Sequence, residues 1–233
     1  MKRIIALLTV ITLVFAFAGC SADTTSNSIQ AATEVKETAS ENNSPETTVV
    51  NVTTAEDNTP DTIGSSSIVV YFSRTGEQYG VGVIDKGNTA IVADMIIEQT
   101  GADSFEITPK EDNYPMTYNE LTDYAKEEQN NNARPEIAST VENFDSYDTI
   151  YLGYPIWWGD LPMICYTFLE SYDFSDKTII PFCTHAGSGN AGTQSKIQSA
   201  APNADVKEVL AIAGTDAQND QDSVKSQVID WLQ

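Results

Sequence analysis

Residues that suit a flat, conjugated ligand gather just after a hydrophobic run in the middle of the chain. Trp157 and Trp158 are adjacent and lie between Pro155 and Gly159. The preceding run, 149–154, is short, apolar and rich in β-branched and aromatic residues, which is typical of a strand buried on both faces. Aromatic rings on a loop past the carboxyl end of such a strand favour a planar ligand. The alternative interpretation is that both tryptophans belong to the hydrophobic core.

A second group of residues suits an anion. Hydroxyl and amide side chains, with two glycines, follow the first predicted strand and lead into a helix: Ser73, Thr75, Gly76, Gly87, Asn88 and Thr89. Free backbone N–H groups at a helix N-terminus attract anions, and the helix dipole adds to that attraction. The segment lacks the lysine and the spacing of a nucleotide P-loop, so it does not predict ATP or GTP binding. Arg74 either pairs with a phosphate or is a solvated surface residue.

A third loop, 184–189, follows a later strand and contains His185, the only histidine of the chain. This histidine is either a hydrogen-bond donor or proton relay to a ligand, or a structural loop residue. A single histidine without a cysteine pair at ligand spacing predicts no metal site. The run 187–192 fits G-x-G-x-x-G, but too little chain follows it for a permanent NAD site. Its glycines are better explained by close approach of the loop to a ligand ring.

Alternating strands and helices position these three loops. We predict strands at 67–72, 104–108, 149–154, 178–183 and 206–213, and helices at 89–101, 117–129 and 192–200. A further helix is predicted after Asp160, which would be its N-cap, with Pro162 in its first turn. The last helix is predicted after Asp222 as N-cap, with Val224, Val228, Ile229 and Leu232 facing inward. This alternation predicts an α/β fold, a doubly wound five-stranded parallel sheet with helices on both faces. In the strand order 2-1-3-4-5, strands one, three and four are neighbours, so their loops converge at the switch point.

The three loops, taken together and in this order, resemble the flavodoxin-like FMN-binding family. The resemblance covers residues 67–232 and rests on the motifs Ser73–Gly76 with Gly87–Thr89, Tyr154–Asp160 and Thr184–Gly189. It implies that FMN is the cofactor, with its phosphate on the first loop and its ring between the other two. The cofactor-binding residues it implies are Ser73, Arg74, Thr75, Gly76, Asn88, Thr89, Pro155, Ile156, Trp157, Trp158, Gly159, Thr184, His185, Gly187, Ser188 and Gly189. No residue is identified as catalytic.

The first motif departs from the family pattern, because residues 77–86 split its phosphate loop. The insertion contains Tyr79 and Gly80-Val-Gly82, and it either extends the phosphate loop or lines the ligand or a partner surface. The split leaves the role of Gly76 open.

The N-terminal segment predicts export and lipid anchoring. Two basic residues precede an apolar run, 4–17, and the segment ends in small residues followed by Cys20. This pattern resembles a bacterial lipoprotein signal over 1–19 with lipidation of Cys20; a plain secretory signal is the alternative. Residues 20–66 are rich in Ser, Thr, Asn and acids, which predicts a disordered tether. Residues 67–233 then form one domain at the extracytoplasmic face of the membrane.

The chain carries a formal net charge of −22. Such acidity argues against nucleic acid as a partner. We expect electron transfer with redox partner proteins, quinone or NAD(P)H. Two alternatives remain: an NAD(P)H- or quinone-dependent FMN oxidoreductase, and a lipoprotein that binds a flavin or another planar ligand without redox turnover. Cys165 and Cys183 are expected to be buried thiols, with a disulfide between them as the alternative.

Overall fold

The computed structural model describes residues 66–233 of the chain. The predicted signal, the lipidation site at Cys20 and the tether up to residue 65 lie outside the described residues.

Six parallel strands form the central sheet: β1 (Ser67–Tyr71), β4 (Asp103–Glu106), β5 (Thr149–Pro155), β6 (Thr178–His185), β7 (Asp205–Val206) and β8 (Leu210–Ala213). The order is β4-β1-β5-β6-β7, and β8 also pairs with β6. This confirms the predicted doubly wound order 2-1-3-4-5. The fifth predicted strand, 206–213, is interrupted, because residues 207–209 leave the ladder between β7 and β8.

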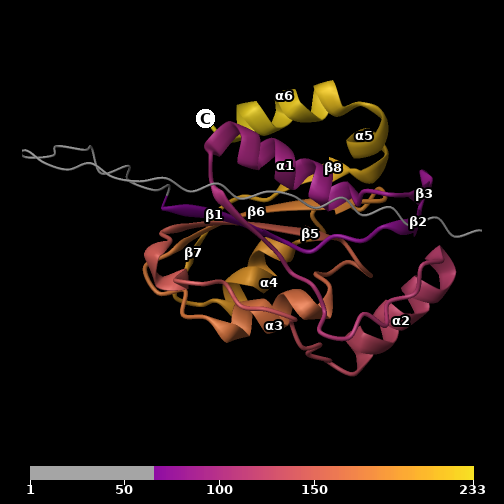
Figure 1. Cartoon of the computed structure of the whole chain (residues 1–233), viewed down its shortest axis with the longest axis horizontal. Helices are drawn as coiled ribbons and strands as arrows, with labels where there is room; N and C mark the ends of the chain where they lie inside the picture. Colours follow the sequence, from indigo (N-terminus) through magenta and orange to yellow (C-terminus); the bar gives the residue numbers. More distant parts are fainter. Residues whose placement is uncertain (1–65) are drawn as a thin grey trace, which may run out of the picture. The chain divides into compact units, whose positions relative to one another are not determined.

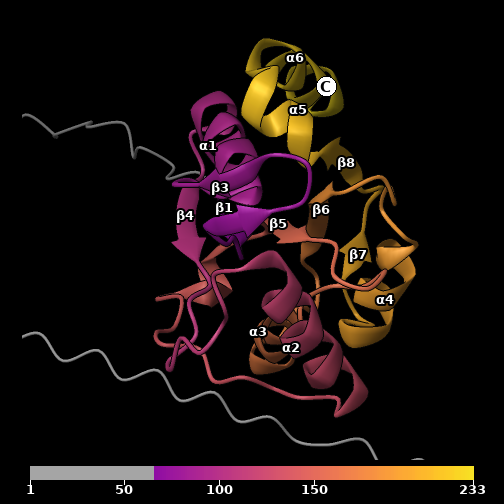
Figure 2. The ribbon, with the colours of Figure 1, turned by 90° about the vertical axis from the view of Figure 1, so that its right-hand side faces the viewer.

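Helices cover both faces of the sheet (Figure 1). One face carries α1 (Asn88–Thr100), α5 (Gly214–Asn219) and α6 (Gln221–Trp231). The other face carries α2 (Tyr118–Asn130), α3 (Met163–Ser171) and α4 (Thr193–Ala200). A short 3-10 turn, η1 (Phe144–Ser146), precedes β5. Figure 2 shows the same two layers from the side at which β2, β3 and α2 lie.

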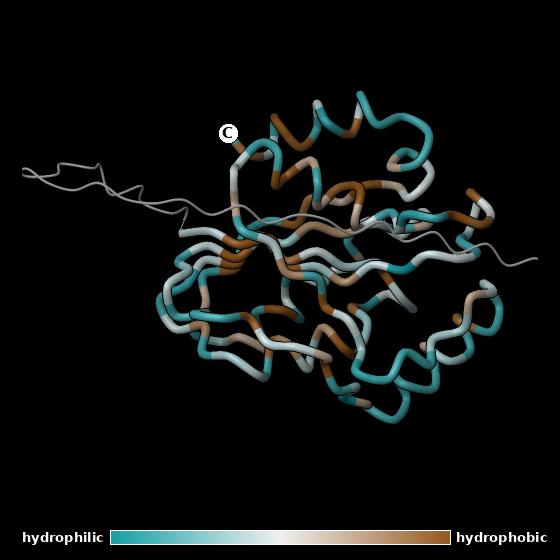
Figure 3. The backbone as a smooth tube through the Cα atoms, viewed as in Figure 1, coloured by the Kyte–Doolittle hydropathy of each residue, from teal (hydrophilic) through white to brown (hydrophobic). Residues whose placement is uncertain are grey.

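The strands supply both cores, because successive side chains point to opposite faces of the sheet. In β1, Val70 packs in the core under α2, α3 and α4, and Val69 packs in the core under α1, α5 and α6. The first core is rich in aromatic rings, and the second is mainly aliphatic. Figure 3 shows the hydrophobic residues gathered along the strands.

Two predicted helix caps are wrong. α3 begins at Met163 with Pro162 at its N-cap position, and Asp160 instead accepts hydrogen bonds from Leu161 N and the hydroxyl of Tyr166, each at 2.8 Å. The cap of α6 is Asp220, whose side chain accepts from Ser223 N, rather than Asp222.

The inward face predicted for the last helix is also partly wrong. Val224 and Val228 are fully buried, but Ile229 remains 38% exposed, so the helix buries a narrower stripe than expected. α1, in contrast, ends as predicted, because Gly101 adopts the left-handed conformation at its C-cap.

The insertion in the first motif forms a hairpin that the sequence did not reveal. Its strands are β2 (Gly76–Gln78) and β3 (Gly82–Ile84), which pair antiparallel outside the main sheet. The short helix α5 was likewise not predicted.

Candidate functional site

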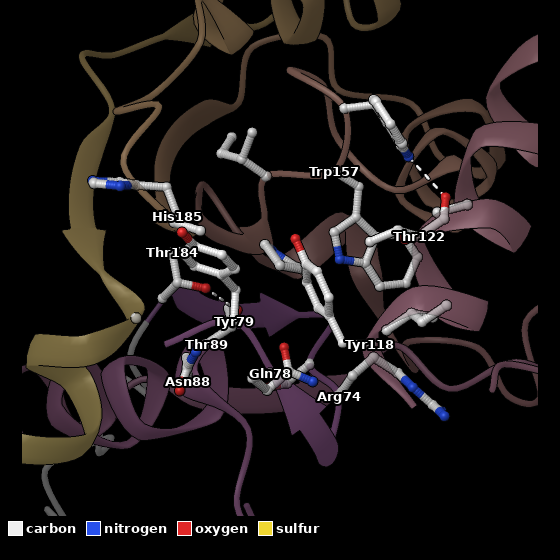
Figure 4. A pocket seen from close by; sticks show the side chains of 18 residues that line it. Arg74, Gln78, Tyr79, Asn88, Thr89, Tyr118, Thr122, Trp157, Thr184 and His185 are labelled. Atoms are coloured by element: carbon white, nitrogen blue, oxygen red, sulfur yellow. Dashed lines mark hydrogen bonds between the residues drawn. The ribbon is translucent and has the colours of Figure 1, made fainter. Parts of the chain in front are cut away.

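A cavity opens where the carboxyl ends of β1, β5 and β6 meet, and it brings the three predicted loops together (Figure 4). The predicted residues that line it are Ser73, Arg74, Asn88, Thr89, Pro155, Ile156, Trp157, Trp158, Thr184 and His185. The predicted residues that do not line it are Thr75, Gly76, Gly159, Gly187, Ser188 and Gly189. Their roles as ligands stay predictions.

The two halves of the split first loop come back together at the start of α1. Ser73 Oγ accepts a hydrogen bond from Ala90 N at 3.0 Å, so the residue after β1 caps the helix from outside. Gly87 packs directly against Ser73 and Arg74, since an added Cβ at Gly87 would lie 2.6 Å from the carbonyl oxygen of Arg74 and closer still to Ser73 Oγ. The insertion therefore does not separate the two halves of the loop, which meet at the N-terminus of α1.

Buried hydroxyls tie this helix start to β6. Thr89 and Thr184 share a hydrogen bond of 2.8 Å between their Oγ1 atoms, and the two residues are 1% and 3% exposed. Asn88 is held from α5, because its Oδ1 accepts from Gln218 Nε2 at 2.8 Å. The polar end of the cavity is thus fixed from three elements.

Arg74 is neither solvated nor unpaired. Its side chain is 10% exposed and binds both carboxylate oxygens of Asp112, at 2.8 and 2.7 Å. A second guanidinium nitrogen donates to the carbonyl of Tyr114 at 3.1 Å, and the guanidinium lies over the Tyr114 ring. The interpretation of Arg74 as a solvated surface residue is wrong. Its Nε remains buried without an acceptor among the described residues, although Arg74 lines the cavity.

The second loop makes a tight turn at its tryptophans. Trp157 and Asp160 exchange two backbone hydrogen bonds of 2.9 and 3.0 Å, and the residues between them have positive φ, 51° at Trp158 and 72° at Gly159. Two positive φ angles are the pattern of a type I′ turn, which glycine adopts readily and tryptophan does not. Lys196 secures the turn from α4 by donating to the Gly159 carbonyl at 2.8 Å and pairing with Asp160 at 2.9 Å.

The two tryptophans have different surroundings. Trp157 is half-buried, and its ring centroid lies 5.5 Å from those of Phe72 and Tyr114, both in edge-on contact. Trp158 is 55% exposed, and its Nε1 donates to the Thr122 carbonyl of α2 at 2.8 Å. Both line the cavity. The alternative that both are core residues is therefore wrong: Trp157 packs against the core and forms part of the cavity wall, and Trp158 lies at the rim.

Tyr114, whose ring contacts Trp157, forms a buried polar pair with Glu128. The Tyr114 hydroxyl donates to Glu128 Oε2 at 3.1 Å, and both residues are buried. Burial, and next the nearby Glu128 charge, raise the pKa of Tyr114; burial also raises the pKa of Glu128, which the hydrogen bond partly offsets.

The His185 ring points away from the other lining side chains (Figure 4). Its Nδ1 accepts a hydrogen bond from Gly187 N at 3.0 Å. Burial lowers the pKa of His185, and the charge of Asp216 partly opposes that shift. These contacts favour the interpretation of His185 as a structural loop residue over its interpretation as a proton relay to a ligand. Gly187 and Gly189 have positive φ, a backbone conformation that favours glycine. The close approach of this loop to a ligand ring stays a prediction.

Gln78 and Tyr79 line the cavity, which agrees with the alternative that the insertion lines a ligand. The other lining residues were not predicted as site residues: Tyr118, Leu121, Thr122, Ala125, Ala186 and Gly214. A signal existed for α2, because Tyr118, Leu121 and Ala125 recur at helical spacing on one face. These three residues of that face line the cavity.

The remaining reactive groups lie away from the cavity. Cys165 and Cys183 are free and buried, as expected, and burial raises the pKa of Cys183 to about 12. In residues 66–233, no group of three or more His, Cys, Asp or Glu side chains could hold a metal ion. No helix in that range has the length and apolar character needed to cross a membrane.

Comparison with known proteins identifies a family and several similar structures. A family model described as flavodoxin matches residues 68–229. A candidate flavoprotein from Bacteroides eggerthii is 27% identical, with a TM-score of 0.57, over 72% of this chain and 99% of that one. A second from Bacteroides uniformis is 29% identical, with a TM-score of 0.57, over 71% and 99%. A flavoprotein in complex with FMN from Lactobacillus acidophilus is 20% identical, with a TM-score of 0.54, over 72% and 99%, and shows the fold alone. No curated protein matches the chain.

Proposed function

The chain belongs to the flavodoxin family, and from that premise we propose that it is an FMN-binding electron carrier. The observation that carries the proposal is the cavity at the switch point of the sheet. It joins a hydroxyl-lined helix start at one end to an aromatic wall at the other. Those two ends match the phosphate and the flat ring of FMN.

The residues present fit such a ligand. Ser73, Asn88 and Thr89 line the cavity at the N-terminus of α1, and the buried Nε–H of Arg74 lacks an acceptor among the described residues. Trp157 and Trp158 give the other end an apolar, polarisable surface. When bound, FMN supplies one- and two-electron transfer, which no side chain of the protein provides.

The chain's own part is to hold the ring, exclude water and set the electrostatic field. Half-buried Trp157 excludes water from one side of the cavity. Trp158 is held in place by its hydrogen bond to Thr122, and Lys196 holds the turn at 157–160. The domain of residues 67–233 contains 26 acids and nine Lys or Arg residues. That excess of negative charge opposes adding further negative charge to a bound group, which favours a low reduction potential.

A spectrum followed by two reductants tests the proposal. The purified protein is saturated with FMN, then treated anaerobically with NADPH and, separately, with dithionite. A carrier holds FMN with its absorption near about 450 nm and is reduced by dithionite but not by NADPH. Rapid bleaching by NADPH would instead make the protein an FMN oxidoreductase. Failure to take up FMN would refute the flavin assignment itself, and bound FMN that no reductant changes would leave a non-redox flavin-binding protein.

We place this carrier at the extracytoplasmic membrane face, anchored through lipidated Cys20. The sequence of residues 1–20 supports that placement. Cys20→Ser should move the protein from the membrane fraction to the soluble fraction of cells. A variant that stays fully membrane-bound would contradict the anchor.

A further inference from the structure

The hairpin β2–β3 spans the region between α2 and α5 beside the cavity. At its base, Glu77 N donates to the Met116 carbonyl at 2.8 Å, and the Glu77 carboxylate accepts from Tyr118 N, at the start of α2, at 2.9 Å. At its tip, Gly80 lies against Thr215 of α5, where an added Cβ would be 3.3 Å from Cγ2. A two-stranded ribbon of this length is marginal alone, so these contacts determine where it sits.

The hairpin and α2 each contribute one tyrosine to the cavity. The rings of Tyr79 and Tyr118 lie 5.7 Å apart between centroids, tilted by 45°, and both line the cavity. Figure 4 shows both rings projecting into the space between Thr184 and Trp157. Tyr79 is 62% exposed. Among the described residues neither tyrosine hydroxyl makes a hydrogen bond, so what each side chain offers to the cavity is its ring.

These rings face a gap in the aromatic wall. The segment 186–192 that follows β6 contains no aromatic residue, and the ring of His185, at the end of β6, points away from the other lining side chains. Neither therefore stacks on a flat ligand opposite the tryptophans. A ring ligand between the tryptophans and the tyrosines would gain dispersion contacts and lose water on both of its faces. It would also cover the exposed surface of Tyr79, whose exposure is otherwise unfavourable.

We propose that Tyr79 and Tyr118 form the second wall of an aromatic slot for the isoalloxazine ring, opposite Trp157 and Trp158. The inserted segment 77–86 is then a ring-binding element, and its split of the phosphate loop is a consequence of delivering Tyr79 to the slot. This inference rests on the proposed function, since it specifies which residues hold the ring of the same cofactor.

Affinity for FMN and for riboflavin separates ring contacts from phosphate contacts, because riboflavin has the ring without the phosphate. Tyr79→Ala and Tyr118→Ala should each weaken binding of both ligands by roughly tenfold. Tyr79→Phe and Tyr118→Phe should bind like the parent, because the ring is kept. Val83→Ala is the matched control, since Val83 is 79% exposed on the same hairpin and does not line the cavity. Ser73→Ala should weaken FMN alone.

The outcomes are distinct. If the parent protein binds no FMN, the proposed function fails. If the parent binds FMN and both alanine variants bind it equally well, the second wall is refuted while the proposed function stands. Loss of FMN affinity with unchanged riboflavin affinity would place the tyrosines on the phosphate and overturn the inference, as would phenylalanine variants as weak as the alanine ones. Faster FMN dissociation from the alanine variants, with unchanged melting temperature, is the supporting result.

Discussion

The polar end of the cavity at α1 and its aromatic end between Trp158 and Tyr79 are held in place differently. At the polar end, Thr89 and Thr184 are almost fully buried, and Gly87 leaves no room for a single methyl group. At the aromatic end, Trp158 and Tyr79 are more than half exposed, and a few contacts to α2 position them. The difference shows that the polar end is sterically locked, whereas the exposed rings of Trp158 and Tyr79 can change with little effect on the fold.

The largest test of this contrast compares two glycines. Gly87→Ala should destabilise the protein by about 2–4 kcal/mol, because the new methyl meets the backbone of Arg74 and cannot be relieved by a side-chain rotation. Gly82→Ala, on the hairpin, meets no atom within 4 Å, and its φ of 77° costs only about 1–2 kcal/mol of backbone strain. Urea unfolding of both variants measures the difference. Equal costs would mean that the polar end is not sterically locked.

Within the aromatic end, we expect both tryptophans to contribute to flavin binding but only Trp157 to contribute strongly to stability. Trp157→Ala should lower the free energy of unfolding by about 3 kcal/mol, because it removes the half-buried ring from Phe72 and Tyr114. Trp158→Ala should cost about 1 kcal/mol or less, since that ring is mostly exposed. Both should weaken flavin binding. Chemical unfolding and a flavin titration check the two quantities, and a Trp158 variant as unstable as the Trp157 variant would remove the distinction.

The smallest expected effect concerns pH and the loop after β6. Burial lowers the folded-state pKa of His185 below its unfolded value, so its contribution to stability is present above the unfolded pKa and is lost as pH falls through the folded pKa. Protonation of Nδ1 would also remove the acceptor for Gly187 N–H. Between pH 7 and pH 5, His185→Asn should lose less stability than the parent, by about 1 kcal/mol or less. Parallel pH profiles would show that the ring does not brace the loop.

The sequence predicted the sheet order and most of the polar end, because those features depend on local patterns. The run 149–154 reads as a buried strand, Gly101 marks a helix stop, and hydroxyls beside Gly87 mark an anion-binding loop. The converging loops then follow from the handedness of parallel crossovers.

The aromatic end was less predictable, because distant contacts decide it. Trp157 and Trp158 are neighbours in sequence, yet the carbonyl of Thr122 on the distant helix α2 holds Trp158 at the rim. The strands of the hairpin at 76–84 are three residues each, too short for an alternating pattern to show. The misplaced cap of α6 has a simpler cause, since Asp220 and Asp222 are two residues apart and local pattern alone does not separate them.

The hydrogen bond between Thr89 and Thr184 has a kinetic consequence. It joins residues 95 positions apart, and β1 likewise pairs with β5, so both must wait until most of the domain has been synthesised. Contacts of such long range close slowly, because loop entropy is lost before they form. We therefore expect the cavity to assemble late in folding, after α1 itself has formed. Competence to bind flavin would then report completed folding more sensitively than helix content does.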